Sequence, residues 1–125
     1  MEISVFFRSI IDADDMPVVI CDTEHTIVYM NPSAVERYAK RGGTELIGKS
    51  LLACHNAESN IMIEKVVKWF GKSKDNNKVY TFHNKENHDI YMIALRDDTG
   101  KLIGYYEKHE SRTPETETRY NIYEN

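Results

Sequence analysis

Residues 16–34, MPVVICDTEHTIVYMNPSA, carry the pattern from which most of the fold can be predicted. Two short runs of β-branched and apolar residues, 18–21 and 26–30, lie on either side of the polar stretch 22–25. Such runs on both sides of a polar turn predict a β-hairpin. Asn31 is a favourable N-cap and Pro32 suits the first helical position, so a helix is expected directly after the second strand.

Helices are predicted on both sides of this hairpin. Before it, an apolar stripe at three- and four-residue spacing predicts a helix that ends near residues 12–15 and is formed by Ile3, Phe6, Phe7, Ile10 and Ile11. After it, the helix that follows Pro32 should stop at Gly42-Gly43, and TELIGKSLL (44–52) predicts a short helical turn.

The strongest helical pattern lies between Asn56 and Phe70. Its apolar stripe contains Ile63, Val66, Val67 and Phe70. Asn56 or Ser59 is expected to cap the start of this helix, and Gly71 is placed for a left-handed cap at its end.

Three strands are predicted in the last third of the chain, at residues 79–83, 89–95 and 102–110. The stretches 84–88 and 96–100 between them are rich in turn formers, and the last pair forms a hairpin. Two strands before the helices and three after them predict an α+β fold, a five-stranded antiparallel sheet with helices packed on one face and an additional N-terminal helix. The expected organisation is an N-terminal amphipathic helix (1–14), one domain (15–111) and a polar tail (112–125).

Composition excludes several classes of protein. At 125 residues, 41% hydrophobic and 29% charged, the chain is expected to form one folded domain. Its net charge is −4 and its Lys and Arg residues are scattered, so no nucleic-acid partner is expected. No apolar run approaches the roughly 20 residues that span a bilayer. The absence of a signal-peptide pattern and the two cysteines in apolar surroundings predict a cytoplasmic location and no membrane insertion.

Four segments in this order resemble a PAS domain. They are the apolar strand with Asp22, Asn31 before the first helix, the Glu-x-x-Gly turn of ELIGKSL (45–51), and the closing hairpin RDDTGKLIGYYEKHES (96–111). Within that family, GKSLLACHNAES (48–59) is similar to bacterial PAS domains with Cys-His-Pro before the long helix, although Asn56 replaces the proline here.

The resemblance implies the PAS fold and a sensory or signalling function without enzymatic activity. It also implies an internal pocket for a small apolar ligand or haem, with Met62, Val66, Ile103 and Tyr105 as candidate lining residues. His55 is the candidate axial ligand of a haem iron, and the adjacent Cys54 could offer a thiolate. In the alternative interpretation, Cys54 is a small buried residue and His55 bonds the exposed amides of the next helix.

Other chemistries have little support in the sequence. The His and Cys residues are spread over different predicted elements, whereas a zinc site needs three or more convergent ligands. No pairing of a nucleophile with its base and no phosphate-binding loop is evident, so no enzymatic activity is expected.

Two functions from different classes therefore remain open. The first is a sensor that holds a small ligand or haem. The second is a PAS module with a filled core that serves only in association, as a homodimer formed through the N-terminal helix and the outer sheet face, because exposed Ile3, Phe6, Phe7 and Ile10 would form an apolar patch. If the 125 residues are the whole chain, a signalling partner is expected to act in trans.

Overall fold

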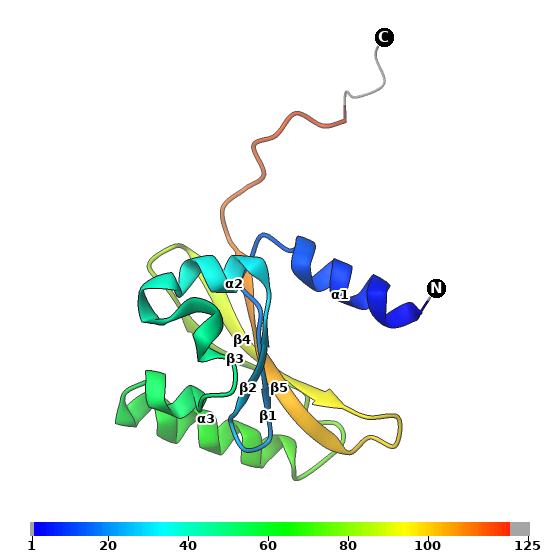
Figure 1. Cartoon of the computed structure of the whole chain (residues 1–125), viewed down its shortest axis with the longest axis vertical. Coiled ribbons are helices and arrows are strands. Elements are labelled where there is room, and N and C mark those ends of the chain that lie inside the picture. Colours follow the sequence, from blue (N-terminus) through cyan, green and yellow to red (C-terminus); the bar gives the residue numbers. More distant parts are fainter. Residues whose placement is uncertain (1, 121–125) are drawn as a thin grey trace.

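The computed structural model describes residues 2–120, and at its centre is an antiparallel sheet with the strand order β2-β1-β5-β4-β3 (Figure 1). The strands are β1 (Val19–Asp22), β2 (Ile27–Met30), β3 (Lys78–His83), β4 (His88–Arg96) and β5 (Leu102–Ser111). All five predicted strands are confirmed to within two residues, and so are the hairpins β1–β2 and β4–β5.

The helical segments between β2 and β3 cover one face of the sheet (Figure 1). They are α2 (Pro32–Arg37), three single-turn 3₁₀ helices η1 (Ala39–Arg41), η2 (Gly43–Leu46) and η3 (Leu51–Cys54), and α3 (Ala57–Phe70). The N-terminal helix α1 (Ile3–Ala13) lies apart from them, beside the opposite face of the sheet. The α+β arrangement predicted from the sequence is confirmed.

Side chains alternate between the two faces of the sheet, as the pleat of a strand requires. Cys21 of β1 faces Tyr105 of β5, and both are about 1% exposed beneath the helices. Their neighbours Ile20 and Tyr106 point to the outer face and stay partly exposed. The core therefore lies on the inner face, where α3 contributes the buried Ile63 and Phe70.

Helices α2 and α3 both begin at the predicted N-cap residues. The side chain of Asn31 accepts a hydrogen bond from Ala34 N at the start of α2, and that of Asn56 accepts one from Ser59 N at the start of α3. The prediction for Gly71 was wrong, because its φ is −72° and lies in the right-handed region. The chain continues in a helical turn in which Lys72 N donates to Trp69 O, so no left-handed residue is needed.

Asn31 also joins α1 to the sheet. Its side chain is fully buried, and its Oδ1 accepts a second hydrogen bond from Val18 N at 2.8 Å. Its Nδ2 donates to the carbonyl oxygens of Ile11 and Met16 at 2.9 and 3.0 Å. One amide therefore fixes the end of α1, the start of β1 and the start of α2.

Helix α1 buries none of its residues. The apolar side chains of Ile3, Phe6, Phe7 and Ile10 are 51 to 70% exposed, as the sequence predicts. Within residues 2–120, every helix is too short or too polar to span a bilayer.

The predicted polar tail leaves the end of β5. Residues 112–120 form no helix or strand and are exposed, and residues 121–125 lie outside the described part of the chain. The Asp89 carboxylate of β4 holds the start of the tail by accepting hydrogen bonds from Arg112 Nε at 2.7 Å and Tyr80 Oη at 2.8 Å. These partners hold the pKa of Asp89 well below its usual range.

Candidate functional site

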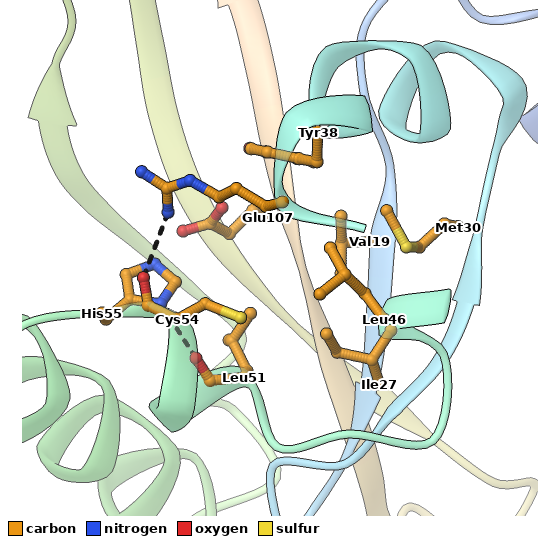
Figure 2. Close-up of a pocket in the computed structure, with 10 residues that line it drawn as sticks. Val19, Ile27, Met30, Tyr38, Leu46, Leu51, Cys54, His55 and Glu107 are labelled. Carbon is orange, nitrogen blue, oxygen red and sulfur yellow. Dashed lines mark hydrogen bonds between the residues drawn. The ribbon is translucent and has the colours of Figure 1, made fainter. Parts of the chain in front are cut away.

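An inner cavity of about 60 Å³ lies between the sheet and the helical segments that follow β2 (Figure 2). Its apolar wall is formed by Val19, Ile27, Met30, Leu46 and Leu51. His55 and Glu107 lie together on the other side of the cavity in Figure 2, with Tyr38 above them. The cavity is thus apolar at one end and polar at the other.

A larger open cleft of about 510 Å³ adjoins this cavity between α2, the start of α3, and strands β3 to β5. Tyr38, His55 and Glu107 line both spaces. We call these three residues the neck, because they border the cavity and the cleft alike. The cleft is lined by both polar and apolar side chains, and Arg37 and Glu58 are among the charged ones.

Glu107 is the most unusual group at the neck. It comes from the inner face of β5, between the buried Tyr105 and His109. Among residues 2–120, its carboxylate has no hydrogen-bond or ion-pair partner. Burial raises the pKa of the Glu107 carboxyl, and the nearby His55 and Arg37 oppose that rise. Its remaining accessible surface faces the cavity and cleft, so any partner has to come from inside them.

The positive charges near Glu107 are bound to other groups. The guanidinium of Arg37 donates two hydrogen bonds to the carboxylate of Glu86. Arg41 Nη1 donates to the backbone oxygen of Cys54 at 3.1 Å. Glu107 therefore lies near cations without being paired to one.

His55 is oriented by the backbone. Its Nδ1 lies 2.9 Å from the Leu51 carbonyl oxygen, so Nδ1 carries the proton and donates it to that oxygen. The structure gives Nε2 no hydrogen bond to any residue from 2 to 120. The start of α3 is capped by Asn56 and not by His55. The imidazole is consequently a preoriented neck residue with one free nitrogen.

Comparison with solved structures identifies the fold. The PAS domain of Bordetella pertussis BvgS superposes with a TM-score of 0.64 at 17% identity, over 89% of this chain and 87% of that one. The Aer2 receptor of Vibrio cholerae, described as a dual PAS-heme oxygen sensor, gives a TM-score of 0.53 at 18% identity, over 78% and 94%. The chain has the PAS fold.

A third PAS-fold neighbour, the Vibrio cholerae VqmA dimer, gives a TM-score of 0.59 at 14% identity over 90% of this chain and 53% of that one. No protein-family model matches the sequence. No curated protein matches it either. At these identities the likeness concerns the fold, and the function has to be argued from the site.

The structure brings some of the predicted site residues together and separates others. Cys54 and His55 line the inner cavity, and Met62 lines the cleft. Val66 is packed in the core and lines neither space. Tyr105 is buried nearby, with its hydroxyl 2.8 Å from His25 Nδ1.

Ile103 lies away from both spaces, with a 51% exposed side chain. Simple alternation along β5 would place it on the same face as Tyr105. The register between β4 and β5 shifts between Leu95 and Arg96, and Leu102 packs against the core in its place. This irregularity reverses the inside and outside positions at the start of the strand.

Sequence reasoning missed Glu107, Tyr38, Arg37 and His109. Glu107 and His109 follow Tyr105 at two-residue spacing, which is the signal that places all three on one face of β5. Burial lowers the pKa of His109 to about 4, and its Nδ1 has no hydrogen-bond partner among residues 2–120. The polar character of the inner face was therefore detectable from strand periodicity once Tyr105 was placed in the core.

The neck does not fit a haem in this conformation. The apolar part of the site measures about 60 Å³, whereas pockets for drug-sized ligands measure about 300–1,000 Å³. The larger cleft has a mixed polar and apolar lining, and it contains the unpaired Glu107 together with His55. Within residues 2–120, no three His, Cys, Asp or Glu side chains converge to hold a metal ion. The Nε2 of His55 has no hydrogen bond to residues 2–120, but the space around His55 disfavours a porphyrin.

Proposed function

We propose that residues 15–111 form a sensory PAS module that binds a small molecule at the neck and in the inner cavity. The observation that supports this most directly is that Tyr38, His55 and Glu107 line both the open cleft and an apolar cavity in the core. Pockets of this kind, apolar with a few convergent polar groups, are the usual sites of small ligands. The module is proposed to be cytoplasmic and to have no enzymatic activity, and Cys21 and Cys54 are both free thiols.

Native mass spectrometry of the protein purified from its own host tests this proposal. We expect a retained small molecule, or a mass shift when a metabolite extract is added. Ala53→Trp is the control variant. It should still bind the molecule, because Ala53 does not line the cavity or the cleft. In Leu51→Trp the cavity is filled, and binding should be lost. Equal binding by both folded variants would contradict the proposed site.

Haem is tested separately by adding haemin to the purified protein. The cavity geometry predicts no Soret band characteristic of histidine-bound haem. A stable band that disappears in His55→Ala would restore the haem hypothesis and assign the axial ligand to His55. Retention of the band in His55→Ala would assign the haem to another site.

We further propose that the signal is passed through a homodimer formed by α1 and the outer sheet face. The same shallow hollow is lined by Phe7 and Ile11 of α1 and by Ile20 and Tyr29 of the sheet, so the two apolar surfaces are continuous. A second copy of the chain presents the same patch and can cover it by two-fold symmetry. The VqmA neighbour is described as a dimer, which supports association between two copies of a chain with this fold.

Sedimentation velocity tests the dimer. Phe6→Glu and Ile10→Glu should shift the protein to monomer, because a charge would be buried in the interface. Ser9→Glu introduces the same charge at another exposed position of α1 and serves as the control. A monomeric wild-type protein at all concentrations would favour a partner in trans as the occupant of this surface.

If the cavity proves empty in every assay while the dimer forms, the second interpretation holds. The chain is then a ligand-free PAS module for homodimerisation or protein interaction. The specific observation that favours it is the small volume of the inner cavity.

A further inference from the structure

The chemistry of the neck indicates which class of small molecule the cavity selects. This inference rests on the proposed ligand-binding function and goes beyond it by assigning the ligand's polar group. Three polar side chains meet at the neck, and their hydrogen-bonding states differ. His55 has one nitrogen committed to Leu51 O, whereas the Glu107 carboxylate has no partner among residues 2–120.

An unpaired carboxyl inside a protein is unfavourable unless something donates a hydrogen bond to it. Arg37 and Arg41 also line these spaces, but each donates to another acceptor. Arg37 donates to Glu86, and Arg41 donates to the Cys54 carbonyl oxygen. Glu107 therefore keeps an acceptor site directed into the cavity and cleft, available to a water molecule or to a ligand.

Glu107 discriminates between ligand classes through the ionised form of its carboxyl. Burial favours the neutral form, and a ligand carboxylate or phosphate at the neck would disfavour the ionised form further by like-charge repulsion, whereas a cation there would stabilise it. An N–H donor, above all a protonated amine, would instead form a charge-assisted hydrogen bond, roughly twice as strong as a neutral one.

The other end of the ligand is set by the inner cavity. Its wall of Val19, Ile27, Met30, Leu46 and Leu51 offers no polar side-chain atom. At about 60 Å³ it has room for only a few heavy atoms, since one water-sized probe occupies about 10–15 Å³. The apolar part that enters the core must therefore be small, such as a short alkyl group.

We propose that the neck recognises a small amine or nitrogen heterocycle, whose N–H group donates to the Glu107 carboxylate and whose short apolar end fills the inner cavity. His55 Nε2 lines the same neck and provides the second polar contact. The cleft accommodates whatever part of the ligand extends beyond Glu107.

Titration of the full chain with three matched four-carbon probes, n-butylamine, n-butanol and n-butyrate, tests this assignment. Backbone amide chemical shifts measured by NMR report both the affinity and the site, through the signals of Cys54, His55 and Glu107. We expect saturable binding of n-butylamine at these residues, at least about tenfold tighter than that of n-butyrate.

The variant Glu107→Gln keeps the size of the side chain and removes its charge. It should weaken n-butylamine binding about tenfold and change n-butanol binding by less than about twofold. Glu110→Gln is the matched control, because Glu110 lies on the same strand but is half-exposed, paired with Lys108 and outside the lining of both spaces. Thermal unfolding of both variants verifies that they are folded.

The outcomes separate the two proposals. Binding of n-butanol or n-butyrate at the neck without preference for n-butylamine would overturn the assignment and leave the ligand-binding function intact. Unchanged n-butylamine affinity in Glu107→Gln would also overturn it. Failure of all three probes to perturb the neck residues would overturn both.

Discussion

Replacing Asn31 by alanine should be far more damaging than removing an ordinary helix cap. The side chain is completely buried, and its Oδ1 is the acceptor for two buried backbone N–H groups, those of Val18 and Ala34. Each donor left unsatisfied inside a protein costs about 1–3 kcal/mol, so we expect a loss of about 4 kcal/mol in the free energy of unfolding. At about 4 °C per kcal/mol for a domain of this size, Tm should fall by about 15 °C.

Asn56→Ala is the matched control for this prediction. Asn56 caps α3 in the same way, but it accepts only from Ser59 N and its site is exposed. Its loss should cost about 1 kcal/mol, as for a typical cap. Urea and thermal unfolding followed by circular dichroism measure both variants.

Hydrogen exchange adds a second readout for Asn31→Ala. Because Asn31 Nδ2 also donates to the carbonyls of Ile11 and Met16, the amides at the end of α1 should exchange faster in this variant and not in Asn56→Ala. If the two variants lose equal stability, or if α1 is equally protected from exchange in both, Asn31 does not join α1 to the sheet.

Three further predictions concern β5 and its neighbours. Gly104→Ala should prevent normal pairing of β5 with β1, since an added Cβ would lie 2.2 Å from Cys21 O, whereas Gly71→Ala meets only ordinary contacts; a Gly104→Ala variant with unchanged Tm would disprove the close approach. Glu107→Gln should be more stable than wild type above pH 4.5 and equally stable below it. Burial raises the pKa of Glu107 in the folded state, so as pH rises the unfolded chain ionises first and the wild-type fold loses stability. Tm measured against pH checks the sign. As pH falls from 6.5 to about 4, His109→Gln should lose less stability than wild type. Burial lowers the pKa of His109 to about 4, so in the wild type the unfolded chain takes up this proton first. Parallel pH profiles of Tm would contradict this.

The elements of the fold were predictable because their signals are local. A polar turn between two β-branched runs specified β1 and β2, and Asn31 followed by Pro32 specified the start of α2. Asn56 likewise marked the start of α3. In each case the deciding hydrogen bond joins residues three positions apart, so a short window of sequence contains the whole interaction.

The candidate site was less predictable because it depends on strand register. Ile103 was expected to line the pocket as the resemblance implies, but the irregularity opposite Arg96 turns it to the exposed side. The two-residue spacing places Glu107 on the same face as Tyr105, but which face of β5 points inward is decided by its pairing with β1 and β4. The structure places His55 beside the cavity, and its partner Leu51 O is positioned by the 3₁₀ turn of η3, which the sequence predicted only as a helical turn.

The alternation along β5 has a mechanical consequence. Glu107 faces the cavity, while its neighbours Tyr106 and Lys108 face the hollow that is also lined by Ile10 and Ile11 of α1. The proposed ligand space and the proposed dimer surface are thus separated by the thickness of one strand. A ligand that displaces β5 where it binds Glu107 would therefore also move the surface on which α1 lies. No loop separates the two sites.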